Sequence, residues 1–400
     1  MSERPHILIA GAGIGGLTAG LSLLRKGFDV TLCDQAPDLH EVGAGVQTAA
    51  NASRVLIALG LGDELARIGY QPTERETRLW NTGQRWTQIA LGATAVERYG
   101  FPHYTVHRAD LQRVLIEAVR REKPDAIRLG TRCIGFEQTA LGVALKLESG
   151  ETILGDALVG ADGIHSTIRS ILFGEDKPRF TGFVAWRGLA PAAKLPDALK
   201  RQVSTNWISP NAHAVHYLVR NGELMNIIAV VERDDWQVES WTAQGTTAEW
   251  AADYAGWHPD IHAIIANIET PFKWALMLHE PLPQWSIGRV TLLGDACHSA
   301  LPFLAQGAAM AIEDGYVLAR CAEQHRGDIA AALGRYERAR MERTARMVRG
   351  AAEQTSRLHN PALADQATAE AHVKRVYEEQ LVTQRLDWLY SYDAVNGKID

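Results

Sequence analysis

A glycine pattern, Gly11-x-Gly13-x-x-Gly16, constrains the fold of this chain more than any other feature. The segment His6–Ala10 before it is a short apolar run of strand length, and Leu17–Lys26 after it carries leucines at helical spacing. A strand that turns through glycines into a helix exposes free backbone N–H groups at the positive end of the helix dipole. The pattern therefore predicts a turn that binds the phosphates of a nucleotide.

An acidic residue follows this motif at the distance typical of a dinucleotide site. The segment Phe28–Cys33 alternates like a strand and ends at Asp34, which stands 23 residues after Gly11. A carboxylate at the end of this second strand is placed to accept hydrogen bonds from a ribose diol. The alternative is a glycine-rich turn with a purely structural role. Strand, helix and acid in register favour the nucleotide site, with predicted contacts at Gly11, Gly13, Gly15, Gly16 and Asp34.

Two later strand ends carry a similar pairing of glycine and aspartate. In "ALVGADGIHSTIR" an apolar strand ends at Asp162 and Gly163, and in "RVTLLGDACH" another ends at Gly294 and Asp295. Each alone is also typical of an ordinary turn in which aspartate caps a helix. A long dinucleotide such as FAD needs anchors at several strand ends, and we expect a buried carboxylate such as Asp295 to hold a ribityl hydroxyl.

The remaining chain reads as alternating α and β segments without repeats or low-complexity linkers. Two glycine-turn hairpins are expected over 127–163, and aromatic residues recur through a strand-rich stretch from 180 to 274 that we interpret as an antiparallel sheet. Helices are expected over 51–68, 111–121, 307–324 and 329–358. The Glu/Arg run from Arg335 to Arg349 is expected to form a solvated helix face with i,i+4 ion pairs. Nucleotide-like strand ends at both ends of the chain predict two domains interleaved in sequence.

Composition excludes several classes of protein. A net charge of −6 provides no general basic field for nucleic acid. The four cysteines are scattered without a CxxC pair, which indicates reduced thiols rather than disulfides or a metal site, and hence a cytoplasmic protein. No stretch is long and apolar enough to be a membrane span, and the apolar start, Ile7–Gly16, is interpreted as a buried strand rather than a signal peptide.

Taken together and in this order, the three glycine–aspartate motifs resemble the single-component (class A) flavoprotein aromatic hydroxylases, which have the p-hydroxybenzoate hydroxylase fold. The resemblance covers nearly the whole chain, and within the family it is greatest to salicylate hydroxylase-like, 6-hydroxynicotinate 3-monooxygenase-like and 3-hydroxybenzoate 6-hydroxylase-like enzymes. It implies an α/β fold in which a Rossmann-like FAD-binding domain (1–75, 100–178 and 275–325) is interleaved with an antiparallel β-sheet substrate domain (76–99 and 179–274). A C-terminal helical region (326–400) completes the chain.

The resemblance also implies roles for individual residues around a non-covalent FAD. The Asp162–Gly163 segment would serve both the flavin and the reduced pyridine nucleotide, and Asp295 would contact the ribityl chain. Arg108, in "HRADL", matches an arginine that contacts FAD, and Gln47, in "VGAGVQ", matches the stretch near the flavin edge. His298 is expected to be structural or a neighbour of the flavin.

On the substrate side, "NAHAVHYLVR" places His213 and Tyr217 four residues apart, so that a strand would point both side chains to one face and His216 to the other. The resemblance implies that His213 and Tyr217 lie beside the substrate phenol and that Pro302 faces the flavin ring. Their alternative is a cross-strand pair in an ordinary sheet. Trp186, Met225 and Phe303 are candidate pocket walls, and each could equally be a core residue. Pro302 stands where 3-hydroxybenzoate enzymes tend to have glutamine, which favours a salicylate- or hydroxynicotinate-type substrate.

The implied reaction is hydroxylation of a small hydroxy-aromatic carboxylic acid by dioxygen, with NADH or NADPH as reductant and a flavin C4a-hydroperoxide as the oxidant. His213, with an ordinary pKa near 6.5, would remove the phenol proton, assisted by Tyr217. Decarboxylation would accompany hydroxylation if the attacked carbon bears the carboxylate. Three alternatives stay open: 3-hydroxybenzoate 6-hydroxylase-type chemistry, an FAD oxidase or reductase without oxygen insertion, and a flavin-binding regulatory protein. The protein is expected to be a monomer or a homodimer without nucleic-acid or membrane partners.

Overall fold

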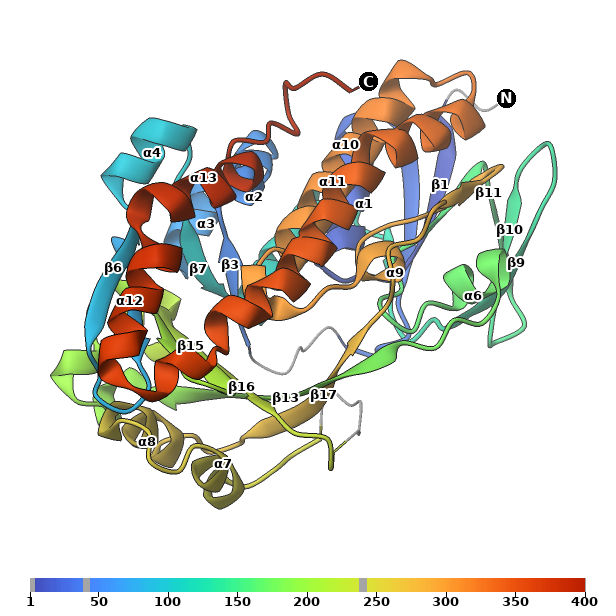
Figure 1. Cartoon of the computed structure of the whole chain (residues 1–400). Helices are drawn as coiled ribbons and strands as arrows, with labels where there is room; N and C mark the ends of the chain where they lie inside the picture. The colour runs from blue at the N-terminus through green and yellow to red at the C-terminus, as the bar shows by residue number, and fades with distance from the viewer. Residues whose placement is uncertain (1–3, 39–43, 237–242, 400) are drawn as a thin grey trace.

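The computed structural model describes residues 4–38, 44–236 and 243–399, and its architecture is mixed α/β (Figure 1). A six-stranded sheet and a seven-stranded sheet form its two main layers of β structure. Long helices from the C-terminal third of the chain run across the space between them (Figure 1). This arrangement confirms the predicted fold class.

The six-stranded sheet has the strand order β18-β19-β12-β1-β2-β8. All neighbouring pairs from β19 to β8 are parallel, so the carboxyl ends of these strands meet at one edge of the sheet. The bounds are β1 His6–Ala10, β2 Asp29–Cys33, β8 Ile127–Arg128, β12 Ala157–Gly160, β18 Ser286–Ile287 and β19 Val290–Leu292. The three predicted glycine–aspartate motifs all follow strands of this sheet.

Helix α1 (Ile14–Arg25) packs on this sheet between α5 (Arg108–Glu122) and α10 (Gly307–Gln324). The crossing of α1 and α10 is close because Gly315 lies directly against the backbone of Ala19. A Cβ atom added at position 315 would lie only 2.6 Å from the Ala19 nitrogen. Helix α10 is thereby fixed over the nucleotide motif.

The seven-stranded sheet has the order β17-β13-β16-β15-β14-β5-β6 and is antiparallel except for the parallel pair β14–β5. Helices α7 (Thr247–Asp253) and α8 (Pro259–Ala266) cover its outer face (Figure 1). The strand bounds are β5 Glu74–Leu79, β6 Arg85–Ala90, β13 Arg179–Pro191, β14 Val203–Ile208, β15 Ala212–Val219, β16 Leu224–Glu232 and β17 Phe272–Leu278. Its inner face is turned toward the six-stranded sheet and the long helices.

Two three-stranded sheets and the remaining helices complete the chain. The small sheets consist of β3 Gly45–Thr48, β7 Tyr104–His107 and β4 Gly69–Tyr70, and of β11 Thr152–Gly155, β10 Val143–Leu147 and β9 Cys133–Gln138. The other α-helices are α2 Ala50–Ala58, α3 Gly62–Ile68, α4 Ala93–Tyr99, α6 Thr167–Phe173, α9 Asp295–His298, α11 Ile329–Leu358, α12 Gln366–Tyr377 and α13 Glu379–Tyr390. Short 3-10 turns lie at Ala192–Lys194, Asp197–Leu199, Arg220–Gly222, Pro302–Leu304 and Pro361–Ala364.

The single helix predicted over 51–68 is wrong. The segment forms two helices, α2 and α3, because Gly60 between them has a φ of +63°. This left-handed conformation ends α2 before α3 begins. By contrast, the expected helices over 307–324 and 329–358 are confirmed as α10 and α11.

The solvated helix face predicted from Arg335 to Arg349 is also wrong at its centre. Arg340 is completely buried, and its guanidinium lies 2.7 Å from carboxylate oxygens of both Glu313 and Asp314 on α10. Arg343 forms a further ion pair with Glu313 at 2.8 Å, and His298 lies 2.6 Å from Asp314. The arginines that sequence periodicity placed in water thus join α11 to α10 through a buried charge network.

The segments predicted for the two domains supply the strands of the two large sheets, and we propose the same division.

Among the described residues, no helix combines the length and hydrophobicity needed to cross a membrane.

Candidate active site

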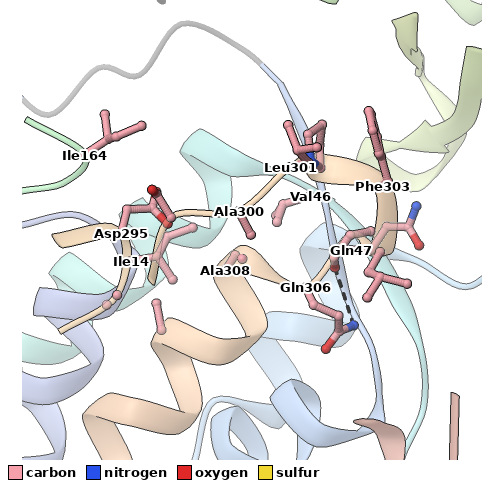
Figure 2. A pocket seen from close by; sticks show the side chains of 18 of the residues that line it. Ile14, Val46, Gln47, Ile164, Asp295, Ala300, Leu301, Phe303, Gln306 and Ala308 are labelled. Atoms are coloured by element: carbon pink, nitrogen blue, oxygen red, sulfur yellow. Dashed lines mark hydrogen bonds between the residues drawn. The ribbon is translucent and has the colours of Figure 1, made fainter. Parts of the chain in front are cut away.

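One large cavity, of about 1430 Å³, lies between the two sheets and the C-terminal helices. Its lining includes the last residues of β1 and β2 and the residues that directly follow β12 and β19 in the first sheet, together with side chains of the inner face of the second sheet. Figure 2 shows part of it, with Asp295 and Ile164 on one side, Val46 and Ala300 between, and Phe303 on the other side. One cavity is therefore lined by both the predicted nucleotide-binding residues and predicted substrate-binding residues.

The glycine motif has the geometry of a phosphate cradle. Gly11 has a φ of +105°, and a Cβ atom there would lie 2.3 Å from the carbonyl oxygen of Ala161. Gly16 is equally enclosed, since its Cβ would meet the Gly11 oxygen at 2.1 Å. At Gly13, in contrast, a Cβ would meet no atom within 4 Å, although the residue lines the cavity. Gly11 and Gly16 thus hold the turn, and Gly13 leaves its backbone open to a ligand.

Asp34 lies at the end of β2, beside this turn. Its carboxylate accepts hydrogen bonds from the backbone N–H groups of Ala12 at 2.7 Å and Ala36 at 2.9 Å. These bonds fix the carboxylate at the edge of the cavity, where the predicted ribose contact would be made. Gly15 also lines the cavity, at the start of α1.

The second motif, Asp162–Gly163, lines the cavity from the end of β12. Asp162 accepts hydrogen bonds from the Ser166 hydroxyl and from the Ile168 backbone N–H, so it orders the turn into α6. Burial raises the pKa of Asp162, and these hydrogen bonds oppose the shift. The aspartate therefore has a local capping role in addition to any ligand contact.

Asp295 differs from its prediction in one respect, because its side chain is exposed rather than buried. It faces the cavity from the first residue of α9, directly after Gly294, and forms no hydrogen bond with another described residue (Figure 2). A carboxylate with free oxygens beside the cavity fits a contact with polyol hydroxyls. Arg108 and Gln47 also line the cavity, from the start of α5 and from β3.

His213 lies on the cavity wall at the head of a chain of hydrogen-bonding groups. Its Nδ1 atom is 2.7 Å from Nε2 of His359, and Nδ1 of His359 is 2.9 Å from a carboxylate oxygen of Glu232. Both imidazoles are buried, whereas 47% of the Glu232 side chain is exposed. The chain therefore leads from the cavity to the protein surface.

This arrangement determines the tautomer of His213. Because a carboxylate can only accept, Nδ1 of His359 must donate to Glu232, and Nε2 of a neutral His359 is left as an acceptor. Nδ1 of His213 then donates to His359, and Nε2 of His213 keeps its lone pair. Burial lowers the pKa of His213 well below its ordinary value, and His359 adds to the shift. His213 is thus neutral at neutral pH, and its pKa lies below the ordinary value of about 6.5.

Tyr217 lies on the same face of β15, toward the other end of the strand, and lines the cavity with Val215 between it and His213. Burial raises the pKa of Tyr217, and a hydrogen bond from Gln47 opposes the shift. The hydroxyl is therefore a neutral donor at neutral pH. Gln47 also contacts Arg75, whose Nη2 lies 3.3 Å from the Gln47 side-chain oxygen, so Gln47 links Tyr217 and Arg75.

Of Pro302 and the three predicted pocket walls, the structure places two residues at the cavity. Pro302 and Phe303 line it, and the Phe303 ring packs edge-on against His213 at 4.9 Å. Trp186 and Met225 are instead buried on the outer face of the sheet, so their prediction as pocket walls is wrong. Trp186 stacks on Trp250 of α7. The reason is strand parity: successive side chains of a strand point to opposite faces of the sheet, and these two occupy the face turned away from the cavity.

The neighbours of these two residues confirm this parity. Arg187, next to Trp186, lines the cavity, and Asn226, next to Met225, accepts a hydrogen bond from the Gly45 backbone on the inner side. His216 is buried near Trp207, away from the cavity lining, as its odd offset predicts. His298 is bonded within the Asp314 network and has the structural role that was one of its two expectations.

Known proteins similar to this chain agree with this geometry. A family model described as an FAD binding domain matches residues 4–351. The chain belongs to this family of FAD-binding proteins. It is 38% identical over 397 residues to a 3-amino-4-hydroxybenzoate 2-monooxygenase of Streptomyces platensis, an alignment that covers 98% of this chain and 97% of the relative. It is 36% identical to the 6-hydroxynicotinate 3-monooxygenase of Pseudomonas fluorescens over 355 residues, or 87% of this chain and 91% of that one.

A solved structure gives the same assignment. The HpxO protein of Klebsiella pneumoniae, in a crystal structure with FAD and uric acid, superposes with a TM-score of 0.84 at 28% identity and covers 98% of both chains. This chain is therefore an NAD(P)H-dependent flavoprotein monooxygenase of the aromatic hydroxylase type, with FAD as its cofactor. The open Gly13 backbone and the unpaired Asp295 carboxylate in one cavity fit that cofactor.

Arg75 and His359 are among the residues of the flavoprotein's cavity region that sequence reasoning missed. Arg75 lies in β5, where its alternation with the buried Glu76 could have indicated an inward-facing cation. His359 follows the end of α11 and reaches His213 only through the tertiary fold. No local pattern in the sequence marks it.

Proposed function

We propose that this flavoprotein hydroxylates a monocyclic hydroxy-aromatic carboxylic acid whose hydroxyl and carboxylate lie at opposite ends of the ring. The proposal rests on one observation: His213 and the Tyr217–Arg75 pair line the same cavity as the FAD-binding strand ends, but at separate places on the sheet. Four residues of a strand span about 13 Å, and side chains stand roughly perpendicular to the sheet. The base and the cationic group therefore bracket a ring from two ends.

FAD supplies the oxidising chemistry, since no side chain can activate dioxygen toward an aromatic ring. His213 accepts the phenol proton at Nε2, the nitrogen that the His359–Glu232 chain leaves unprotonated. The resulting phenolate ring is more nucleophilic. The positive charge that forms on His213 is stabilised by passing its Nδ1 proton toward His359 and Glu232. Phe303 packs against the imidazole and keeps water from this end of the cavity.

The part of the cavity around Arg75 suits a carboxylate. Arg75 lines it together with Gln47, Gln88, Asn206 and Tyr217, which are all hydrogen-bonding side chains. Arg75 forms hydrogen bonds with Gln47 and Tyr390 but no ion pair with a described acid. A guanidinium recognises a carboxylate through two parallel hydrogen bonds, and the neutral Tyr217 hydroxyl adds a third donor.

This spacing favours the 6-hydroxynicotinate type of substrate over the salicylate type. In the former the two groups are across the ring, whereas in salicylate they are adjacent and could contact only one end of the site. The relatives acting on 3-amino-4-hydroxybenzoate and 6-hydroxynicotinate carry names with the same across-ring relation. We also propose a cytoplasmic location, supported by the four free thiols.

A panel of acids tests the proposal. Purified holoenzyme would be assayed with 6-hydroxynicotinate, 4-hydroxybenzoate, 3-hydroxybenzoate and salicylate for stimulated NAD(P)H oxidation and for oxygen-18 in the product after reaction with labelled dioxygen. We expect label in the product and the highest kcat/KM with an across-ring acid. A preference for salicylate would contradict the substrate geometry, and turnover without label would establish the oxidase or reductase alternative instead.

A further inference from the structure

Four arginines line the part of the cavity formed by the C-terminal helices. Arg346, Arg349 and Arg357 belong to α11, and Arg385 belongs to α13. On α11 the cavity-lining positions are 346, 349, 350, 353, 354, 357 and 358, which is the spacing of one helical face. Arg346 and Arg349 are exposed, whereas Arg357 and Arg385 are partly buried, so the group extends from the solvent into the cavity. We call these four residues the arginine rim.

None of the rim arginines forms an ion pair with another residue of the described chain. Arg346 packs over the Trp388 ring at 4.0 Å, Arg357 donates to the Gln354 side chain, and Arg385 donates to the Val376 carbonyl. Burial lowers the pKa of Arg385, and the charge of Arg357 adds to this effect. Elsewhere on α11, Arg340 and Arg343 are neutralised by Glu313 and Asp314.

The rim is thus a concentration of positive charge on a protein whose net charge is −6. Glu353 also lines this part of the cavity, and it offsets only one of the four charges. Like charges that face one another without acidic partners cost stability unless an anionic ligand compensates them. The arrangement therefore points to an anion that binds from solvent.

The rim lies beside the loop that resemblance places over the flavin. A Cβ atom at Gly350, next to Arg349, would be 3.4 Å from the Leu304 side chain in the turn Pro302–Leu304. The Gly11–Gly16 turn is the proposed place for the FAD pyrophosphate, and Arg75 is the proposed place for the substrate carboxylate. A third anion that must enter the same cavity is the reduced nicotinamide nucleotide, which carries at least two phosphate charges.

We propose that the arginine rim binds the phosphates of NADH or NADPH and holds its dihydronicotinamide ring toward the flavin. Guanidinium groups suit this task because they form paired hydrogen bonds with phosphate and remain charged at all working pH values. A cavity mouth lined by one sign of charge also raises the rate at which an anionic partner arrives. The inference depends on the assignment as an NAD(P)H-dependent flavoprotein, but not on the identity of the aromatic substrate.

The test compares the double variant Arg349→Ala/Arg357→Ala with the control Arg338→Ala, all as holoenzymes. Arg338 is an exposed arginine of the same helix that does not line the cavity. The probes are ADP-ribose, which carries the pyrophosphate without the redox ring, and 6-hydroxynicotinate, both titrated by calorimetry. A lost charged hydrogen bond weakens binding by about tenfold or more, so we expect the double variant to bind ADP-ribose about 100-fold more weakly, with the control unchanged.

Flavin reduction supplies a second readout. At subsaturating NADH the double variant should reduce its flavin more slowly, whereas enzyme reduced by dithionite should react with dioxygen and substrate as the wild type does. Arg349→Lys/Arg357→Lys should recover part of the ADP-ribose affinity. Unchanged ADP-ribose affinity in the alanine variant would overturn the proposal, as would a loss confined to the aromatic acid. ADP-ribose binding requires no hydroxylation. This result would therefore still test the arginine rim if the proposal about the aromatic substrate failed.

Discussion

The Nδ1 atom of His213 lies 2.7 Å from Nε2 of His359, although the two residues are 146 positions apart in the chain. The contact joins the inner face of the seven-stranded sheet to the residue that ends α11, and Glu232 extends it to the surface. This series of hydrogen bonds keeps Nε2 of His213 unprotonated. The tautomer of the base therefore depends on His359 and Glu232, which do not line the cavity.

The first prediction concerns His213 itself. We expect His213→Ala to slow hydroxylation by about 10²- to 10⁴-fold, the usual contribution of a general base, while FAD stays bound. Product formation in a single turnover and the flavin absorbance of the purified variant would measure the two effects. Wild-type rates, or loss of the flavin, would remove His213 from the role of base.

The second prediction concerns the tautomer. His359→Ala removes the acceptor for Nδ1 of His213, so the imidazole can place its proton on Nε2 and lose its capacity as a base. We expect a loss of at least about tenfold in the hydroxylation step, with about 10⁴-fold as the upper limit for a histidine held in the wrong tautomer. Flavin reduction by NAD(P)H should be unaffected.

Glu232→Gln is the matched control for this variant. Its amide oxygen can still accept from Nδ1 of His359, so the loss should be smaller than for His359→Ala. Equal losses of rate in both variants would mean that His213 depends on the negative charge of Glu232 and not on the tautomer that His359 fixes.

The third prediction concerns pH. Because burial and His359 lower the pKa of His213, its protonation should not inhibit turnover near pH 6.5. The pH at which kcat falls because His213 becomes protonated should therefore lie well below 6.5. A limb near pH 6.5 that disappears in His213→Ala would contradict the depressed pKa.

The fourth prediction concerns the buried charge network of α10 and α11. Burial alone would raise the pKa of Asp314, but His298 and Arg340 outweigh it and lower the pKa. A depressed carboxyl pKa stabilises the fold above the unfolded value of about 3.9 and loses this effect as pH falls through the folded value. Arg340→Met removes the one cation that both buried carboxylates share and leaves Asp314 with His298 and Glu313 with Arg343, which should cost about 3–5 kcal/mol of unfolding free energy at pH 7.

Denaturant unfolding at several pH values would check this prediction. The difference between wild type and Arg340→Met should narrow as the pH falls through the folded pKa of the carboxyls, since protonated carboxyls need no cationic partner. The exposed Arg338→Ala, on the same helix, should have little effect. A constant difference across the pH range would indicate that lost packing, not charge, destabilises the variant.

The nucleotide half of the site could be predicted from the sequence because its determinants are local. Gly11, Gly13 and Asp34 lie at strand ends that periodicity alone identifies, and parallel pairing then brings them to one edge of the sheet. Strand parity likewise placed His213 and Tyr217 on one face.

Other features depended on tertiary contacts that no local pattern carries. Trp186 and Met225 are aromatic or apolar residues on strands, and composition cannot tell which of two covered faces they occupy. Arg340 has the helical spacing of a surface residue, but α10 presents two acids to it. His359 is conspicuous only once α11 has been packed against the sheet.

The final prediction tests the open backbone at Gly13. A Cβ atom there would meet no protein atom within 4 Å, and the side chain would occupy the groove where the pyrophosphate is expected to approach the helix N-terminus. Gly13→Val should therefore fold but be purified largely without FAD, with a dissociation constant raised by at least about tenfold, which corresponds to about 1.4 kcal/mol. Gly327→Val provides the control, since position 327 is equally open but lies outside the cavity lining. Circular dichroism would verify the fold and flavin fluorescence the affinity, and a Gly13→Val protein that retained FAD at the wild-type level would place the pyrophosphate somewhere other than this turn.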